Sequence, residues 1–171
     1  VKKFQWNYLP FIGRELSSLK IGIIGFGRLG KFMAKYSEAF GMDVLICDPH
    51  VKQKRYKQLN LINLCKSVDV ISLHIHSSTQ NKSLINSKIL NSLKKKPIII
   101  NTSRGDIVNE KDIIEALDNQ KISGYGCDVI ADEFTNVTDS PIIKKSLKSD
   151  KILITPHVGG MTIEGQYKAC L

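Results

Sequence analysis

The 171-residue sequence predicts an α/β fold built on one doubly wound parallel sheet, and three observations predict it. Short apolar segments alternate along the chain with segments whose apolar residues recur at helical spacing. The short segments are apolar almost without interruption, which is typical of strands that helices cover on both faces of a parallel sheet. A glycine-rich segment, residues 25–30, lies directly between the first strand and the first helix. The chain length suits a single domain of this kind.

About six strands are expected, at residues 19–24, 43–47, 68–73, 97–100, 123–129 and 151–154. Helices are expected at residues 29–40, 86–93 and 110–117, with a weaker helical pattern at 59–64. The apolar residues that predict the first helix are Leu29, Phe32, Met33, Tyr36 and Phe40. Gly41 occupies the position of a C-cap after this helix, and Asn109 is the predicted N-cap of the helix at 110–117.

The chain divides into three parts along its length. Residues 1–18 mix aromatic residues with a proline and a glycine without a clear period, and they are expected to form a lead-in segment. Residues 19–160 carry the predicted sheet and its helices. Residues 161–171 begin a further helix without a capping signal, so we expect this helix to lead toward a part of the protein outside the chain.

The formal net charge of +9 would suit nucleic-acid binding if the basic residues were clustered. They are instead dispersed, for example at residues 52–55, 94–96 and 144–145, and no aromatic residues alternate with them as stacking platforms. We therefore expect no nucleic-acid partner. No apolar run approaches the roughly 20 residues that a membrane span needs, and the start of the chain lacks a secretory signal. These features predict no membrane partner and a cytoplasmic location.

The four cysteines, Cys47, Cys65, Cys127 and Cys170, show neither CxxC pairing nor the spacing of metal ligands. Cys47 and Cys127 lie in apolar, strand-like surroundings. The cysteines are therefore expected to be free thiols in a reducing compartment and not to form disulfides.

The glycine-rich segment has the sequence Gly-Phe-Gly-Arg-Leu-Gly, which fits the pattern G-x-G-x-x-G. Between a strand and a helix, Gly25 permits the tight turn, Gly27 lets the backbone approach a pyrophosphate, and Gly30 lets the helix pack against the sheet. The N-terminus of the helix then offers free N–H groups and positive potential to phosphates. The segment predicts a dinucleotide site in a Rossmann-type domain.

Asp48 closes the second predicted strand, about 20 residues after the glycines, where Rossmann-type domains place an acidic residue. Its side chain can accept hydrogen bonds from the hydroxyls of an adenosine ribose. It would also repel a 2′-phosphate, and the next residues, Pro49, His50 and Val51, supply no arginine to neutralise one. The sequence therefore predicts NAD as the cofactor in preference to NADP.

Three separated blocks carry a more specific pattern. They are Ile-Ile-Gly-Phe-Gly-Arg-Leu-Gly at residues 23–30, Asn-Thr-Ser-Arg-Gly-Asp-Ile-Val-Asn-Glu at 101–110 and Thr-Pro-His-Val-Gly-Gly at 155–160. In order and spacing they resemble the D-isomer-specific 2-hydroxyacid dehydrogenases, and the resemblance covers essentially the whole chain. It implies the NAD-binding domain of an oxidoreductase, similar to phosphoglycerate and glycerate dehydrogenases, that interconverts a D-2-hydroxy acid and its 2-keto acid with NAD(H).

The resemblance implies three catalytic residues. Arg104 matches the arginine that binds the substrate carboxylate and carbonyl, and His157 matches the general acid/base. Glu133 matches the glutamate that pairs with this histidine, although the adjacent Asp132 leaves the register open by one residue. Reduction of a 2-keto acid needs a proton for the developing alkoxide, and an imidazolium held by a carboxylate supplies one. A guanidinium can grip the substrate carboxylate bidentately.

The resemblance also implies contacts with the cofactor at further positions. Arg28 and Leu29 match a pair that meets the pyrophosphate largely through backbone N–H groups, and Asp128 matches an acid near the carboxamide. The residues implied on the nicotinamide side are Thr102, Ser103, His157, Gly159 and Gly160.

The chain departs from the family pattern after the third predicted strand. The family usually has His-x-Pro-Leu-Thr there, whereas this chain has His-Ile-His-Ser-Ser at residues 74–78. His76 thus replaces a proline near the expected adenine pocket and is counted among the cofactor-binding candidates. His74 and His76 have the spacing of a metal pair on a strand, but no third ligand accompanies them, so no metal site is expected.

Family enzymes place a substrate domain mostly before this region and close it with a C-terminal segment. We therefore expect the chain to be one domain of a longer enzyme, inactive alone, with residues 161–171 leading back to the substrate domain. The segment around Trp6 resembles one that helps to build a dimer contact, which implies a homodimer. A non-catalytic, NAD(H)-sensing regulator, like the corepressors that resemble this family, is the alternative. The substrate is left open among 3-phosphoglycerate, glycerate or glyoxylate, and D-lactate.

Overall fold

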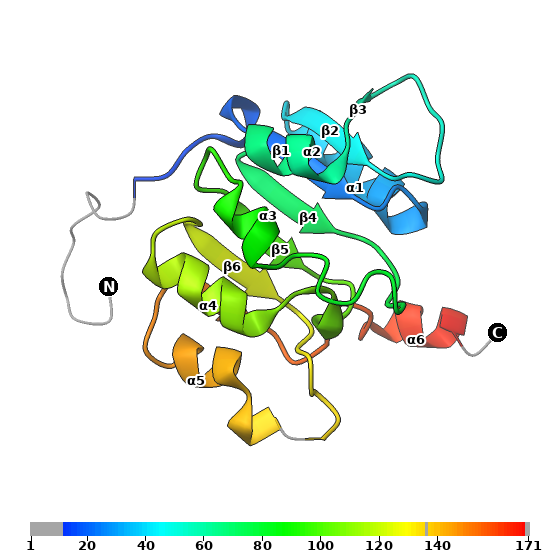
Figure 1. Ribbon diagram of the computed structural model, residues 1–171. Coiled ribbons are helices and arrows are strands. Elements are labelled where there is room, and N and C mark those ends of the chain that lie inside the picture. The colour runs from blue at the N-terminus through cyan, green and yellow to red at the C-terminus, as the bar shows by residue number, and fades with distance from the viewer. Residues whose placement is uncertain (1–11, 136, 170–171) are drawn as a thin grey trace.

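Seven parallel strands form one sheet in the computed structural model, which describes residues 12–135 and 137–169 (Figure 1). The strands are β1 (Lys20–Ile24), β2 (Asp43–Cys47), β3 (Lys57–Gln58), β4 (Val70–Leu73), β5 (Ile98–Asn101), β6 (Gly124–Cys127) and β7 (Ile152–Ile154). Their order across the sheet is β3-β2-β1-β4-β5-β6-β7. The chain starts at β1, winds outward to β3, then crosses back to β4 and builds the other half. This order confirms the predicted doubly wound sheet.

The six predicted strands all form, with small differences at their ends. The seventh strand, β3, was not predicted, because it consists of two exposed polar residues and has no apolar pattern. It pairs with β2 through Leu45 and Ile46. A strand this short depends on its neighbour in the sheet and not on its own sequence.

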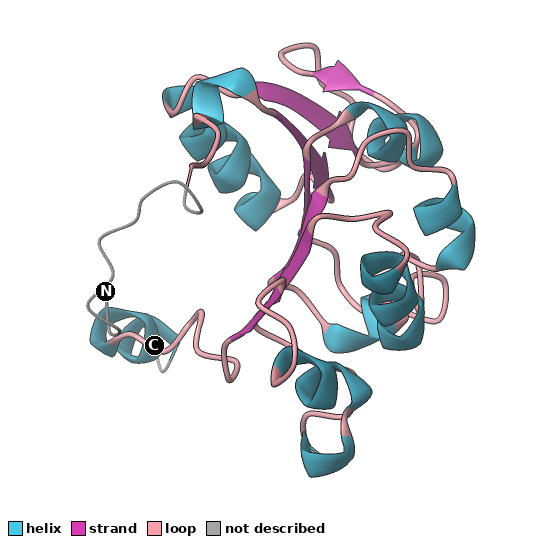
Figure 2. Ribbon diagram, turned by 90° about the vertical axis from the view of Figure 1, so that its left-hand side faces the viewer, coloured by secondary structure: helices cyan, strands magenta, loops and turns pink. Residues whose placement is uncertain are grey.

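Helices connect the strands and cover both faces of the sheet (Figure 2). In the described residues they are α1 (Arg28–Ala39), α2 (Leu61–Ser67), α3 (Ser87–Asn91), α4 (Glu110–Asp118), α5 (Pro141–Ser146) and α6 (Ile163–Ala169). Short 3-10 turns form at Leu16–Ser18, Gly105–Ile107 and Val137–Asp139. The predicted caps form as well: Asn109 Oδ1 accepts from Asp112 N, and Gly41 follows α1 with a φ of +76°. Trp6 and Cys170 lie outside the described residues.

Helix α1 forms where it was predicted, but it buries a different face from the one that its large apolar residues mark. Its buried residues are Gly30, Ala34 and Ser37. The large residues that remain exposed are Leu29, Phe32, Tyr36 and Phe40. Small residues at the contact let the helix lie close to the sheet, so the larger side chains stay on its outer surface.

The two faces of the sheet differ in how far helices cover them. Helices α2, α3, α4 and α5 pack on one face and enclose the larger core cluster with β1, β2, β4, β5, β6 and β7. Helix α1 packs on the other face against β1, β2 and β4. Beyond it, over β5 to β7, Ile98 and Leu153 remain 43% and 71% exposed. On that open stretch the residues of β6 that face away from the larger core are Gly124 and Gly126, which have no side chains. They pair with Ile98 and Ile100 of β5.

Candidate functional site

The predicted site residues follow the carboxyl ends of six neighbouring strands. The glycine segment follows β1, Asp48 follows β2, and His76 comes three residues after β4. Thr102, Ser103 and Arg104 follow β5, and Asp128 follows β6. His157 lies in the loop after β7. The carboxyl ends of parallel strands share one edge of the sheet, and open α/β sheets bind ligands there, at the point where the strand order reverses.

The glycine segment has the geometry that its sequence predicts. Gly25 has a φ of +91°, and a Cβ there would lie 2.4 Å from the carbonyl oxygen of His74. A Cβ on Gly30 would lie 2.0 Å from the carbonyl oxygen of Gly25, so only glycine lets α1 begin so close to the turn. Gly27 differs from both, because a Cβ on it would meet nothing within 4 Å. The space above Gly27 is therefore open for a ligand to approach the backbone.

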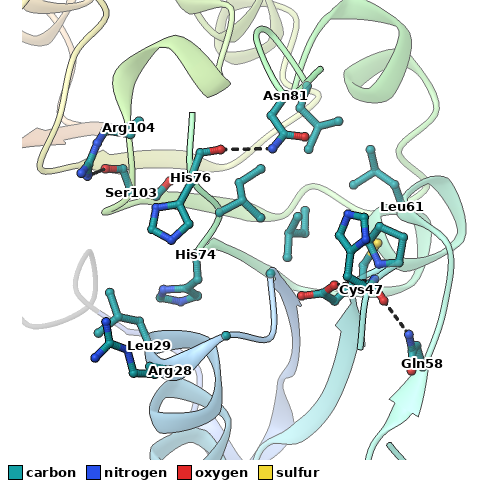
Figure 3. A pocket seen from close by; sticks show the side chains of 18 of the residues that line it. Arg28, Leu29, Cys47, Gln58, Leu61, His74, His76, Asn81, Ser103 and Arg104 are labelled. Carbon is teal, nitrogen blue, oxygen red and sulfur yellow. Dashed lines mark hydrogen bonds between the residues drawn. The ribbon is translucent and has the colours of Figure 1, made fainter. Parts of the chain in front are cut away.

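A cavity of about 900 Å³ lies at this edge of the sheet (Figure 3). Its lining contains nine of the predicted residues, namely Gly25, Gly27, Arg28, Leu29, Asp48, His76, Thr102, Ser103 and Arg104. Gly30 lies beneath the turn, against the backbone of Gly25. Asp128, Glu133, His157, Gly159 and Gly160 do not line this cavity among the described residues, and they form a second group. The structure thus divides the predicted site into a cofactor cavity and a loop cluster around His157.

The carboxylate of Asp48 holds the wall of the cavity together. Its Oδ2 accepts a hydrogen bond from the backbone N–H of Phe26 at 2.8 Å, and its Oδ1 accepts one from that of His50 at 2.8 Å. Gln58 braces the same turn, because its Nε2 donates to the carbonyl oxygens of Asp48 at 2.7 Å and Val51 at 3.0 Å. Gln58 was not predicted as a site residue, and its place in an unpredicted strand explains why.

Two histidines face the cavity from the segment after β4. His74 is partly buried, and its Nε2 lies 2.9 Å from Ser72 Oγ. Burial lowers the pKa of His74, so its ring is neutral at physiological pH. The carbonyl oxygen of His76 accepts from Asn81 Nδ2 at 3.1 Å. Figure 3 shows His76 in the lining of the same cavity as Cys47 and Leu61, but at a distance from them in this view.

Arg104 stands on a turn that Asn101 shapes. Asn101 is fully buried, and its Oδ1 accepts from the backbone N–H of Ser103 at 3.1 Å and from Ser103 Oγ at 2.9 Å. Its Nδ2 donates to the carbonyl oxygen of Arg104 at 2.8 Å. The guanidinium of Arg104 is exposed and donates to the carbonyl oxygen of Ser103 at 2.6 Å. Asn101 was not predicted as a site residue, and an amide that ends an apolar strand is the signal that could have identified it.

His157 and Glu133 meet, as the resemblance implies. Nδ1 of His157 lies 3.0 Å from Oε1 of Glu133, and it is this carboxylate, not that of the adjacent Asp132, that makes the contact. The side chain of Glu133 is 16% exposed, so its carboxylate is largely covered. The side chain of His157 is 45% exposed, so its imidazole is open to solvent. An ionised carboxylate can accept hydrogen bonds but cannot donate them. Nδ1 of His157 must therefore carry the hydrogen in this contact, and Nε2 is the outward nitrogen.

Asp128 fixes the loop that carries His157. Its Oδ1 accepts from Thr155 Oγ1 at 2.5 Å and from the backbone N–H of Val158 at 2.9 Å, and its Oδ2 accepts from that of Gly159 at 2.8 Å. Although burial opposes ionisation, these hydrogen bonds together lower the pKa of Asp128. His157, between these anchors, has a φ of +53°. Asp128 was predicted to lie near the carboxamide of the cofactor, and its contact with this loop was not predicted.

The three cysteines within the described residues lie in the core or in the cavity lining as free thiols. Cys65 and Cys127 are buried, and burial raises the pKa of each thiol to about 12. Cys47 is partly buried in the cavity lining. Within residues 12–135 and 137–169, no three side chains of histidine, cysteine, aspartate or glutamate gather as a metal site would require. No helix in the same part of the chain is long and apolar enough to cross a membrane.

Comparison with known proteins places this geometry in a family context. The model of the D-isomer specific 2-hydroxyacid dehydrogenase NAD binding domain matches residues 1–159. A D-3-phosphoglycerate dehydrogenase from Bacillus subtilis is 32% identical over 171 residues, which cover 97% of this chain and 31% of the relative. A Staphylococcus epidermidis protein assigned provisionally as a 2-hydroxyacid dehydrogenase is 38% identical over 167 residues, which cover 94% of this chain and 50% of the relative.

Solved structures agree with the sequence relatives. The crystal structure of D-lactate dehydrogenase from Aquifex aeolicus, complexed with NAD and lactic acid, has a TM-score of 0.87 and 33% sequence identity. It matches 98% of this chain and 55% of its own. The chain thus spans about half the length, or less, of the relatives it matches.

Proposed function

The chain belongs to the D-isomer specific 2-hydroxyacid dehydrogenase family, as its NAD-binding domain, and from this premise we propose what the whole protein does. We propose that it interconverts a D-2-hydroxy acid and the corresponding 2-keto acid by hydride transfer with NAD(H). The observation that carries the proposal is the contact between His157 and Glu133 at the edge of the sheet that carries the cofactor cavity. The dehydrogenase names of the relatives compared above give the regulatory alternative no support.

The cavity fits NAD by its shape and its chemistry. The open space above Gly27 admits a pyrophosphate to the backbone and to the N-terminus of α1, where Arg28 and Leu29 begin the helix. The carboxylate of Asp48 keeps lone pairs for ribose hydroxyls while it holds the turn. Thr102 and Ser103 line the far part of the cavity, toward Arg104. When bound, NAD(H) supplies or accepts the hydride.

Asp48 also predicts the choice of cofactor. A 2′-phosphate would meet a carboxylate, and in the cavity lining Asp48 is followed by Pro49 and His50 rather than by an arginine. Titration of the protein with NADH and NADPH, followed by cofactor fluorescence, should give tighter binding of NADH. Asp48→Asn should narrow the difference, because it removes the like-charge repulsion. Tighter binding of NADPH by the unmodified protein would overturn this assignment.

The side chains around the substrate have distinct proposed roles. Nε2 of His157 donates a proton to the carbonyl oxygen as that oxygen becomes the hydroxyl of the product, and it takes the proton back in the oxidation direction. Glu133 keeps the ring oriented, with the hydrogen on Nδ1. Arg104 binds the substrate carboxylate with its exposed guanidinium. Asp128, Gly159 and Gly160 hold or form the loop beside His157.

Turnover by the full-length protein tests the proposed function. Purified full-length protein should oxidise NADH with at least one member of a panel of 2-keto acids, among them glyoxylate, pyruvate and 3-phosphohydroxypyruvate. Arg104→Met should raise the KM for the keto acid, because the guanidinium no longer grips the carboxylate. Tight NADH binding without turnover on any member of the panel would contradict a dehydrogenase and favour a regulator.

A homodimer remains part of the proposal. The exposed face of α1 carries Phe32 and Tyr36 with stacked rings 6.3 Å apart, and Phe40 extends it. An apolar surface of this kind suits contact with a second copy of the protein. The molar mass of the full-length protein by light scattering should be that of a dimer, and Phe32→Ser should shift it toward the monomer. A monomer at micromolar concentration would refute the dimer.

A further inference from the structure

Glu110, in the first turn of α4, is a buried carboxylate that no role proposed above uses. It is only 9% exposed, and within the described residues no lysine, arginine or histidine forms an ion pair with it. Burial raises the pKa of its carboxyl group. An ionisable group is rarely kept in such a place without hydrogen bonds that repay its desolvation. Its contacts therefore indicate what it does.

Capping of α4 does not explain this burial. The side chain of Asn109 already caps the helix by accepting from Asp112 N at 3.3 Å. The carboxylate of Glu110 instead reaches another part of the chain. Its Oε1 accepts from the backbone N–H of Ala131 at 2.9 Å, and its Oε2 lies 3.5 Å from Ser140 Oγ.

These two partners lie on either side of Glu133 in the sequence. Ala131 comes two residues before Glu133, and Ser140 is the residue before α5. The peptide between Ile130 and Ala131 also lies directly against the backbone of Gly105, because a Cβ on Gly105 would lie 2.0 Å from the carbonyl carbon of Ile130. Glu110 and Gly105 thus both contact the peptide from which the chain continues to Glu133.

We infer that Glu110 is a positioning residue, whose carboxylate fixes the backbone that presents Glu133 to His157. Its effect on catalysis rests on the proposed function, whereas its effect on the Glu133–His157 contact does not. Without the carboxylate, the N–H of Ala131 turns to water and the segment shifts. Nδ1 of His157 then loses its fixed acceptor, and the neutral ring populates both tautomers.

The test compares four variants of the full-length protein with the unmodified protein. Glu110→Met keeps the volume of the side chain but removes the acceptor. Glu110→Gln keeps an oxygen that can accept from Ala131 and serves as the rescue. Glu115→Ala, on the exposed side of the same helix, is the matched control. Glu133→Gln shows what loss of the partner carboxylate does. Should Glu110→Met fail to fold, Glu110→Asp withdraws the carboxylate by one methylene and replaces it in the test.

The first readout is the 15N NMR spectrum of the His157 ring, which reports the tautomer and needs no turnover. The unmodified protein, Glu110→Gln and Glu115→Ala should show the hydrogen on Nδ1. Glu110→Met should show a mixture like that of Glu133→Gln. Unchanged His157 signals in folded Glu110→Met would overturn the inference and leave Glu110 with a structural role only.

The second readout is kinetic. Keto-acid reduction by Glu110→Met should lose about tenfold in kcat, a part of the factor that acid–base catalysis contributes, with the Kd for NADH unchanged. In the Glu133→Gln background, Glu110→Met should cause no further loss, because it acts through Glu133. An equal loss in both backgrounds would contradict this route. If Glu110→Met changed the His157 tautomer but the unmodified protein reduced no keto acid, the proposed function would be refuted and the inference would stand.

Discussion

The glycine turn after β1 and the His157 loop after β7 both stand at the carboxyl edge of the sheet, but different groups hold them. The glycine turn is fixed mainly by close contacts of its own backbone with the neighbouring turn and with α1, such as Gly30 against the carbonyl oxygen of Gly25, and in addition by one hydrogen bond from the N–H of Phe26 to Asp48. The His157 loop is fixed by a carboxylate, Asp128, which lies 30 residues before Val158 in the sequence. Its partner Glu133 is held by Glu110, which lies 21 residues before Ala131.

This difference separates binding from chemistry within one fold. Backbone contacts leave little freedom, which suits a turn that must always accept the same pyrophosphate. In the His157 loop the carboxylate of Asp128 accepts hydrogen bonds that favour its ionised form. Changes in the glycine turn should therefore alter cofactor affinity, whereas changes around His157 should alter turnover and its response to pH.

The largest expected effect tests that separation directly. His157→Asn removes the proposed proton donor, so kcat for keto-acid reduction should fall by roughly 10²–10⁴-fold. Binding of NADH, measured by fluorescence titration, should stay within about twofold of the unmodified protein, because His157 does not line the cavity. A large loss of NADH affinity in this variant would show that the two regions are not separate.

A second substitution should affect binding and spare the fold. Gly27→Ala places a Cβ where nothing lies within 4 Å, so the melting temperature should stay unchanged. The new methyl group would occupy the proposed approach of the pyrophosphate. NADH affinity should fall by about 10- to 100-fold, as for a steric conflict of ~1–3 kcal/mol. Gly13→Ala, which also meets nothing within 4 Å, is the control. Unaltered NADH affinity in Gly27→Ala would mean that the pyrophosphate does not approach here.

The sequence was sufficient for the glycine turn because all its determinants are contiguous. A strand, three glycines at fixed spacing and a helix N-terminus are local features. The glycines themselves indicate the tight turn and the close packing of the backbone. The caps at Asn109 and Gly41 were predictable for the same reason.

Other features depend on partners that the sequence does not place. The buried side of α1 follows from how closely Gly30 lets the helix approach the sheet, and not from where its large residues lie. Strand β3 exists because β2 offers an edge. The contacts of Asp128 and Glu110 join segments that only the fold brings together. Those carboxylates could be predicted as polar residues near strand or helix ends, but not their partners.

Asp128 should make the stability of the His157 loop depend on pH. Its pKa is lowered from 3.8, since the hydrogen bonds outweigh the burial that opposes them. The ionised carboxylate therefore stabilises the fold above about pH 4, and the contribution is lost as the pH falls through the lowered pKa. Asp128→Asn should cost roughly 1–3 kcal/mol at pH 7, as expected for a lost hydrogen bond to a charged group.

Denaturant unfolding of both proteins at several pH values measures this dependence. The difference in the free energy of unfolding between the unmodified protein and Asp128→Asn should shrink as the pH falls below about 4. Asp43→Asn, at an exposed carboxylate at the start of β2, is the control and should show little difference. A difference that is constant down to pH 2 would mean that the carboxylate acts by shape and not by charge.

The smallest expected effect concerns the open stretch of the sheet over β5 to β7. Gly124 and Gly126 have ordinary strand backbones, and a Cβ on either would come no closer than 3.4 Å to another described atom. Replacing either by alanine should stabilise the described domain by about 0.4–1 kcal/mol, because the unfolded chain loses conformational entropy. The fold would thus accommodate alanine at either position, yet both residues are glycine. If the Gly126→Ala protein were more stable but turned over more slowly, another segment would have to lie directly against the backbone of β6. Glycine would then be retained for this close approach, although it raises the conformational entropy of the unfolded chain.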